Sequence, residues 1–250
     1  MEQVIVITRP AHQAQALSQG IKAAGGDVCL FPTLEIIPTS PSQQHKDTIQ
    51  KLDKFDIIIF ISPNAVDHGL NFISKLPTNA LLATIGQGSA NQLKRKLGKD
   101  PDIVPAENFN SEGLLATNAM QNVENKRILI VRGNAGREVL KQSLEKRGAI
   151  VEYLSVYQRM KPATDSTDLE QYLQNSQVAA IVITSAQSLK NLLEMTPKKA
   201  INQLLQTPLL LIHQRLVNIA KEAKFTGKLM VATQANDEAM IKTLKENSLL

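Results

Sequence analysis

The chain has 250 residues, of which 43% are apolar and 20% are charged, and its formal net charge is +5. This composition excludes a disordered chain and can fill one large core or two smaller ones. The longest apolar runs, IIIFI at 57–61 and AAIVI at 179–183, have the length of strands and are too short to span a bilayer.

We also expect a cytoplasmic protein. The single cysteine, Cys29, excludes an internal disulfide and suits a reducing compartment. The apolar strand pattern VIVIT begins at Val4, which leaves no room for a secretory leader in front of it.

The positive charge is compatible with nucleic acid or with a small polyanion as partner. The basic residues are scattered, and their densest run, LKRKLGK at 93–99, is typical of the solvated end of a helix. Aromatic residues make up 4% of the chain and tryptophan is absent, so platforms for stacking nucleic-acid bases are few. We therefore expect a small anionic ligand and no nucleic acid.

Two segments of the sequence share one order of elements. Residues 4–36 predict an apolar strand, a corner with Arg9, a helix that ends at glycine, and a second strand. Residues 127–159 repeat this order with Arg132 at the corner, and the two arginines stand 123 positions apart. The second corner, VRGNAGRE, resembles a phosphate-binding glycine loop at first sight.

That interpretation fails on spacing. The dinucleotide fingerprint G-x-G-x-x-G would place glycines at Gly133, Ala135 and Glu138, and only the first of these is a glycine. A P-loop would need Gly-Lys-Ser/Thr four residues after a first glycine, and none follows. The segment therefore predicts a strand-turn-helix corner whose arginines suit an anion.

Two further pairs of segments extend the repeat. Ser62 and Ser185 follow the two longest apolar runs and are again 123 positions apart. Ile85 and Ile212 align at an offset of 127, and each is followed by a short strand and a terminal helix. The sequence therefore predicts an internal duplication of a strand-helix unit.

Alternating short strands and helices favour parallel sheets covered on both faces. Two tandem domains divided near 121–126 would fit this pattern. However, the proline-rich segment 32–44 and its counterpart 160–168 interrupt both copies at the same place, which favours an exchanged arrangement. We predict an α/β fold of two flavodoxin-like parallel-sheet lobes with five strands each, joined by a two-stranded linker. The expected bounds are 1–34 with 163–250 for the first lobe, 40–155 for the second, and 35–39 and 156–162 for the linker.

Ligands of such sheets bind at the carboxyl ends of the strands, where helix starts present N–H groups. We expect the two lobes to face each other across a cleft lined by hydroxyls, amides and a few arginines. The histidines His12, His45, His68 and His213 show no metal-ligand spacing. The sequence thus predicts a carboxylate or phosphate site without a metal or cofactor.

Seven short motifs occur in a fixed order along the chain. TRP, FISPNAV, IGQGSA, SEGLL, ILIVRGNAGRE, GAIVEYLSVYQR and VITSAQSL follow one another along essentially the whole chain. Together they resemble the uroporphyrinogen-III synthase family. The resemblance implies two lobes and a lyase of porphyrin and heme biosynthesis that closes the linear tetrapyrrole hydroxymethylbilane to uroporphyrinogen III. It implies no cofactor, and we expect a monomer that receives its substrate from hydroxymethylbilane synthase.

The resemblance also implies a role for Tyr157, in VYQR, as the donor of a proton or hydrogen bond to the departing hydroxyl. The alternative is a linker tyrosine that packs between lobes with a solvated hydroxyl. The strand-end corners and the matching motifs together give the residues expected to bind substrate, namely Thr8, Arg9, Pro10, Ser62, Pro63, Asn64, Ala65, Gly86, Ser89, Ser111, Arg132, Gly133, Asn134, Arg137, Thr184, Ser185, Ala186 and Arg215.

Several of these residues have a structural alternative. Ser62, Thr184 and Ser185 are also expected as helix N-caps, Ser111 as a helix start, and the arginines as partners of nearby acids. The segment IHQRLV at 212–217 departs from the family pattern, so a hydroxyl at that corner cannot be assigned to Leu216.

Other functions of a two-lobed α/β chain are less well supported. A non-catalytic binding protein for a polycarboxylate is the main alternative, although such receptors are normally exported. A nucleotide-sugar transferase would need a pyrophosphate loop, which the sequence lacks. Fold by itself does not decide among these possibilities.

Overall fold

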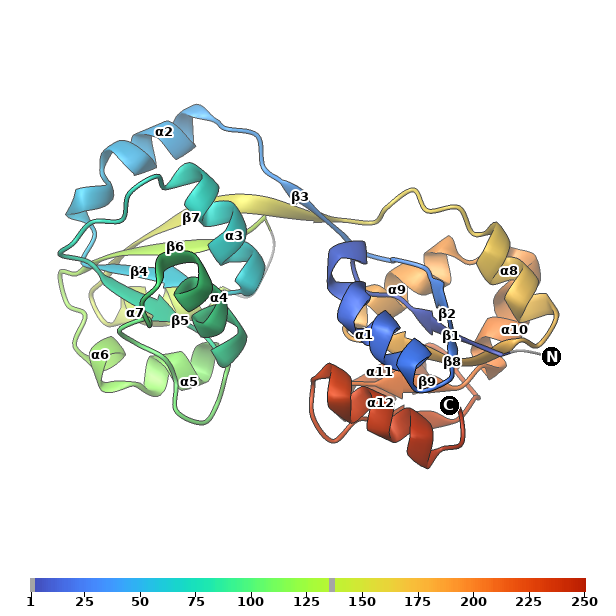
Figure 1. Ribbon diagram of the computed structural model, residues 1–250. Coiled ribbons are helices and arrows are strands. Elements are labelled where there is room, and N and C mark those ends of the chain that lie inside the picture. Colours follow the sequence, from blue (N-terminus) through green and yellow to red (C-terminus); the bar gives the residue numbers. More distant parts are fainter. Residues whose placement is uncertain (1–2, 135–137) are drawn as a thin grey trace. The chain divides into compact units, whose positions relative to one another are not determined.

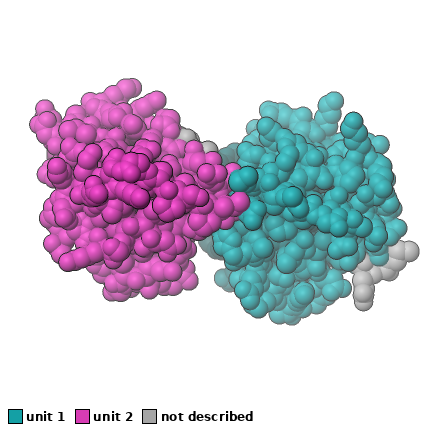
Figure 2. Space-filling model, turned by 90° about the horizontal axis from the view of Figure 1, so that it is seen from above, with its two compact units in different colours: residues 1–35, 160–250 teal, residues 36–159 magenta. Residues whose placement is uncertain are grey.

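The structure is a computed structural model that describes residues 3–134 and 138–250. The chain divides into two compact units, coloured separately in Figure 2: Met1–Glu35 with Met160–Leu250 form unit 1, and Ile36–Arg159 form unit 2. The first 35 residues therefore share a core with the C-terminal part of the chain.

Unit 1 is built on a five-stranded sheet in the order β2-β1-β8-β9-β10 (Figure 1). This is the strand order 2-1-3-4-5 of flavodoxin-like sheets, and each neighbouring pair is parallel. The strands are β1 (Val4–Ile7), β2 (Asp27–Leu30), β8 (Val178–Ile183), β9 (Leu209–Leu211) and β10 (Leu229–Val231).

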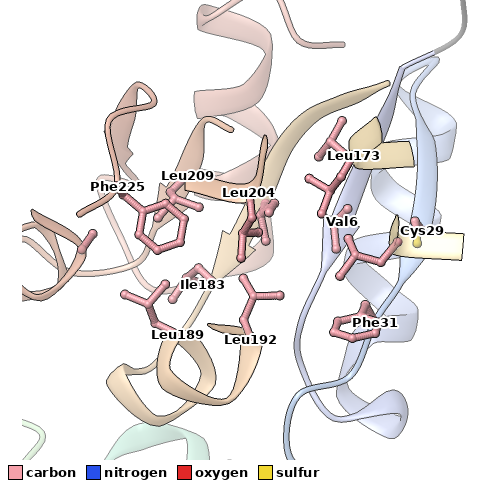
Figure 3. Close-up of a cluster of buried hydrophobic side chains, with 14 of the residues drawn as sticks. Val6, Cys29, Phe31, Leu173, Ile183, Leu189, Leu192, Leu204, Leu209 and Phe225 are labelled. Atoms are coloured by element: carbon pink, nitrogen blue, oxygen red, sulfur yellow. The ribbon is translucent and has the colours of Figure 1, made fainter. Parts of the chain in front are cut away.

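Helices cover both faces of this sheet because its central strands are apolar at every position. Odd and even residues of β1 point to opposite faces: Ile5 and Ile7 pack with α1 and α12, whereas Val4 and Val6 pack with α8 to α11 (Figure 3). The helices are α1 (Ala11–Ala23), α8 (Thr167–Gln174), α9 (Ala186–Met195), α10 (Ile201–Gln206), α11 (Arg215–Glu222) and α12 (Asp237–Glu246), with a 3-10 turn at Lys198–Ala200.

Unit 2 contains the second five-stranded sheet, in the order β3-β7-β6-β4-β5. Its strands are β3 (Glu35–Pro38), β4 (Ile57–Phe60), β5 (Leu81–Thr84), β6 (Arg127–Gly133) and β7 (Ile150–Met160). The helices are α2 (Gln43–Gln50), α3 (Pro63–Phe72), α4 (Gln87–Leu97), α5 (Ser111–Ala116), α6 (Asn118–Gln121) and α7 (Val139–Lys146), with a 3-10 turn at Leu52–Lys54.

The register of strand pairing repeats between the units. Ile5 pairs with Ala180 in unit 1, and Ile128 pairs with Ile57 in unit 2; each residue lies 123 positions from its counterpart. The pairs β1·β2 and β6·β7 also agree residue by residue at this offset over their first four positions. The α/β fold class with parallel sheets is confirmed, and the duplication visible in the sequence extends to hydrogen-bond register.

The fifth strand of unit 2 is not the one that the repeat predicts. The segment after Gly98 forms only an isolated parallel bridge between Ala83 and Ile103. Pro101 and Pro105 flank this segment, and a proline has no N–H with which to extend a ladder. The fifth strand of the sheet is instead β3, which comes from the expected linker. It is an outer strand of the sheet and lies beside β7, on the side away from β5.

The linker residues also differ from expectation at their second crossing. Val156 and Tyr157, assigned to the linker from sequence, are buried in the core of unit 2. They are part of the long strand β7, which continues to Met160. None of the described helices has both the length and the apolar character needed to cross a membrane.

A buried hydroxyl network distinguishes unit 1 from unit 2. Thr8 donates from Oγ1 to the carbonyl of Val182 at 2.7 Å, and Ser188 Oγ lies 2.8 Å from the hydroxyls of both Thr8 and Thr33. At an offset of 123 the corresponding positions of unit 2 are Val131, Ala65 and Val156, all buried and apolar. The same backbone is therefore packed by hydrogen bonds in one copy and by methyl groups in the other.

We expect Ser188→Ala to lower the free energy of unfolding by about 1 kcal/mol, because Thr8 and Thr33 lose a shared partner but keep carbonyl acceptors. The reverse change, Ala65→Ser, places a hydroxyl in the apolar core cluster of unit 2 and should cost about 1–3 kcal/mol. Urea denaturation followed by circular dichroism measures both. Midpoints equal to that of the wild type would show that this network does not contribute to stability.

Candidate functional site

The carboxyl ends of four strands meet at one edge of the unit 2 sheet. β4, β5, β6 and β7 pair in parallel, so their ends lie on the same side. Ser62 follows β4, Gly86 follows β5, Gly133 ends β6, and Tyr157 lies near the end of β7. The structure thus brings these four predicted residues to a common edge.

Tyr157 has a buried ring and a hydrogen-bonded hydroxyl. The residue is 1% exposed and belongs to the core cluster of unit 2. Its Oη lies 3.1 Å from Ser62 Oγ and accepts a hydrogen bond of 3.4 Å from Arg159 Nη2. The alternative of a linker tyrosine with a solvated hydroxyl is therefore wrong, because both the ring and its hydroxyl are engaged within unit 2.

Gly133 makes room for this tyrosine. A Cβ atom at position 133 would lie 2.5 Å from Cε2 of Tyr157, a distance that real Cβ atoms essentially never show. Just after it, the Asn134 amide donates to the Tyr157 carbonyl at 2.9 Å, and Asn134 Oδ1 accepts from the Arg159 amide at 3.2 Å. The glycine of the apparent phosphate loop is thus required by packing against an aromatic ring.

Two helix starts lie next to this corner. Ser62 Oγ accepts the Ala65 amide at 3.0 Å and caps α3, whose first residue is Pro63. α4 begins after Gly86 without a side-chain cap, and its Ser89 is buried. A Cβ on Gly88 would lie 3.7 Å from Cγ of Pro63, so the two starts are neighbours.

Arg132 is committed to a partner inside unit 2. Its side chain is 6% exposed, and Nη1 donates to Glu138 Oε1 at 2.9 Å. The guanidinium carbon lies 4.4 Å from the ring centre of Tyr153, whose hydroxyl donates to Glu138 Oε2 at 2.7 Å. This arrangement favours the structural alternative for Arg132 over contact with a ligand.

At the corresponding strand ends of unit 1, the candidate side chains also have partners within their own unit. Thr8 is fully buried within the hydroxyl network described above, and Arg9 forms an ion pair with Asp237 of α12. Pro10 is buried at the start of α1. The side chains of Thr8 and Arg9 therefore hold unit 1 together rather than pointing to open solvent.

The remaining candidates lie at helix starts or outside the described residues. Ser185 Oγ accepts the Ser188 amide at 3.0 Å and caps α9, as Ser62 caps α3. Ser111 is the first residue of α5, but Asn110 is the cap. The others are Asn64 (half-buried, in α3), Thr184 (half-buried, after β8), Ala186 (exposed, first in α9), Arg215 (exposed, first in α11) and Arg137, which lies outside the described residues.

Among residues 3–134 and 138–250, no group of three or more His, Cys, Asp or Glu side chains is arranged to hold a metal ion. The geometry of the strand-end edges favours anion binding by backbone amides and hydroxyls. Known proteins match this chain over nearly its full length. Residues 15–242 match the family model described as uroporphyrinogen-III synthase HemD.

The chain belongs to the uroporphyrinogen-III synthase family. It is similar to the uroporphyrinogen-III synthase of Salmonella typhimurium, with 30% identity over 246 residues that cover 96% of this chain and 99% of the relative. The synthase of Escherichia coli is 29% identical over the same coverage. The predicted family and enzyme class are thus confirmed: the protein is a cyclising lyase of tetrapyrrole biosynthesis.

Solved synthases share the fold. The structure from Helicobacter pylori matches with a TM-score of 0.65 and 15% identity over 100% of both chains. A mutant synthase from Thermus thermophilus matches with a TM-score of 0.64 and 18% identity over 98% of each chain. These likenesses support the two-domain α/β fold of the uroporphyrinogen-III synthase family.

Sequence analysis did not single out Arg159, which the structure places next to Tyr157 near the end of β7. Arg9 and Arg132 are paired with acids, whereas no described carboxylate of unit 2 lies within salt-bridge distance of the exposed Arg159. Its guanidinium carbon lies 5.9 Å from the ring centre of Tyr157. A signal was available in the sequence, because residues two apart on a strand project to the same face.

The pKa of Tyr153 gives a test of the Arg132 cluster. Burial, and then the hydrogen bond to Glu138, raise the pKa of Tyr153 from 10.0 to about 12. Stability from this tyrosine is present below pH 10 and is lost as the pH rises toward 12. We expect Glu138→Gln to shift the ionisation of Tyr153 to lower pH, as measured by phenolate absorbance with Tyr153→Phe as the reference. An unchanged titration would exclude the contact.

Proposed function

We propose that this chain closes hydroxymethylbilane to uroporphyrinogen III, with inversion of the last pyrrole ring and loss of water. The observation that carries the proposal is the family match over residues 15–242, together with full-length similarity to enzymes that bear this name. The strand-end edges fit a substrate that carries many carboxylates.

The reaction demands shape more than strong acid or base groups. The terminal hydroxyl takes up a proton and departs as water, which leaves an azafulvene-type cation. A substituted carbon of the last ring attacks this cation to form a spiro intermediate, which then reopens and closes in the inverted sense, releasing a proton. Simple closure is geometrically easier, so the enzyme has to hold the acetate and propionate arms where only the productive approach is reachable.

We assign those arms to the strand-end corners. Helix starts offer backbone N–H groups that are fixed before substrate arrives and need no reorganisation. The caps at Ser62 and Ser185 and the uncapped start of α4 at Gly86 support this assignment. The full set of proposed contacts is Pro10, Ser62, Pro63, Asn64, Ala65, Gly86, Ser89, Ser111, Gly133, Asn134, Arg137, Thr184, Ser185, Ala186 and Arg215, with backbone rather than side-chain contacts at Thr8, Arg9 and Arg132.

Tyr157 is the proposed proton donor. A phenol O–H is a donor of the kind that general acid catalysis uses, and the Tyr157 oxygen accepts a hydrogen bond from Arg159 Nη2. When a substrate carboxylate pairs with Arg159, the guanidinium no longer donates to the Tyr157 oxygen. The Tyr157 hydroxyl can then approach the departing hydroxyl group of the substrate. After the proton has been given up, Ser62 Oγ lies 3.1 Å from the Tyr157 oxygen and can donate its hydroxyl proton to the phenolate while it still accepts the Ala65 amide.

We further propose a cytoplasmic monomer that takes its substrate from hydroxymethylbilane synthase. The single cysteine suits a reducing compartment, and in each unit helices of that unit cover both sheet faces. Unassisted closure of free hydroxymethylbilane gives the isomer without inversion, which favours a short path between the two enzymes.

A coupled assay tests the proposed function. Porphobilinogen is converted by a separate deaminase to hydroxymethylbilane in the presence of this protein, and the oxidised uroporphyrins are separated by chromatography. We expect predominantly isomer III, in an amount that depends on this protein. Isomer I alone from a folded sample would refute the proposed activity.

Variants at two residues test the proposed site. We expect Tyr157→Phe to lower kcat about 10²-fold, because it removes a proton donor. Arg159→Gln should raise KM by roughly tenfold, because it removes a cation for a substrate carboxylate. Lys126→Gln removes the same charge at the amino end of β6 and is the control, with steady-state kinetics as the measurement. Full turnover by Tyr157→Phe would remove its catalytic assignment.

A further inference from the structure

Phe109 is exposed where the other phenylalanines are covered. It is 54% exposed, the highest value among the large hydrophobic residues found at the described surface. Phe31, Phe55, Phe60 and Phe225 are at most 5% exposed, and Phe72 stacks on the ring of His45. Isolated exposed apolar side chains are common, so what distinguishes this ring is its location.

That location is the candidate edge of unit 2. The bridge between Ala83 and Ile103 is parallel, so the chain that follows Ile103 runs toward the carboxyl ends of the strands. A Cβ atom on Gly86 would lie 3.1 Å from Cβ of Phe109. Phe109 therefore lies beside the uncapped start of α4, one of the proposed carboxylate-binding corners.

The backbone holds Phe109 within a tight bend. The Asn110 amide donates to the Asn108 carbonyl at 2.8 Å, and the Gly113 amide donates to Asn110 Oδ1 at 2.8 Å. A Cβ on Gly113 would lie only 1.8 Å from the Asn108 carbonyl oxygen, so the bend can close only with glycine there. The exposed ring is thus carried on a braced turn, which lowers the entropy cost of using it in binding.

We propose that Phe109 packs against one pyrrole ring of the tetrapyrrole and contributes to the choice of product isomer. This inference rests on the proposed function. Hydroxymethylbilane presents flat apolar pyrrole faces between its charged arms, and an aromatic side chain covers such a face while nearby amides hold the arms. Gly86 leaves the space beside Phe109 free of a side chain.

The absence of tryptophan from the chain gives a direct binding test. Phe109→Trp introduces a single indole at the proposed contact. Leu81→Trp introduces one at the amino end of β5, where Leu81 is 45% exposed. This position lies at the end of the strand opposite to Gly86. The probe is uroporphyrinogen III, kept reduced under nitrogen.

On titration we expect saturable quenching and a spectral shift of the Phe109→Trp emission, and no saturable change for Leu81→Trp. In the coupled assay, Phe109→Ala should raise KM by about 3- to 10-fold and increase the share of isomer I, whereas Phe109→Tyr should retain both values. Leu81→Ala, the matched loss of an exposed apolar side chain, should leave both unchanged.

The outcomes separate this inference from the proposed function. A wild-type protein that forms no isomer III refutes the function itself. A wild-type protein that forms isomer III, with Phe109→Ala unchanged in KM and isomer ratio and Phe109→Trp emission unaffected by saturating uroporphyrinogen III, overturns only the role of Phe109.

Discussion

The parallel pairing of β1 with β8 is the constraint on which the rest of the structure depends. It joins Val4–Ile7 to a strand more than 170 positions later, and so makes unit 1 discontinuous. Once these strands pair, the chain between them has to leave unit 1, build unit 2 and return, which requires two crossings. Parallel pairing also places the ends of all five strands of the unit 1 sheet on one side, and the ends of β4, β5, β6 and β7 on one side of the unit 2 sheet. The helix starts and their amides gather there. The gathering of helix starts at these strand ends is thus a consequence of topology before any particular side chain is considered.

The two copies share one register of strand pairing but differ in the side chains at equivalent positions. At an offset of 123, Gly133 and Tyr157 of unit 2 correspond to Pro10 and Leu34 of unit 1. Unit 2 admits an aromatic ring against a glycine, and unit 1 does not. Conversely, unit 1 ties its strand ends with the hydroxyls of Thr8, Thr33 and Ser188, where unit 2 has only apolar groups. Equivalent positions of the two sheets thus carry a tyrosine packed against a glycine in unit 2 and a buried hydroxyl network in unit 1.

The arginines of the two units differ in whether an acid of the same unit pairs with them. Arg9 and Arg132 stand at equivalent corners, and each is held by an acid of its own unit. An arginine that already pairs with a carboxylate of the protein has to share its positive charge between that partner and a ligand carboxylate. It therefore binds the ligand less strongly than an unpaired arginine would. Arg159 has no such partner within the described part of unit 2, and it lies over the one tyrosine at the edge. The guanidinium of Arg159 is therefore less engaged with acids of its own unit than those of the conspicuous arginines of the motifs, which is the basis for proposing Arg159 as a substrate contact.

The pattern along the chain alone predicted most of the strands, the repeated order of elements and the family, because hydrophobic period, corner residues and a constant offset are local properties. It also gave the caps at Ser62 and Ser185, whose residue type and position are sufficient. It did not predict the fifth strand of unit 2. Tertiary structure decided which candidates are occupied: Thr8 is consumed by a network with residues 25 and 180 positions away, and Arg132 by Glu138 and Tyr153. It decided that β3 rather than the segment between Pro101 and Pro105 completes the second sheet. Partnership and burial depend on contacts between distant segments, and no local pattern in the chain encodes them.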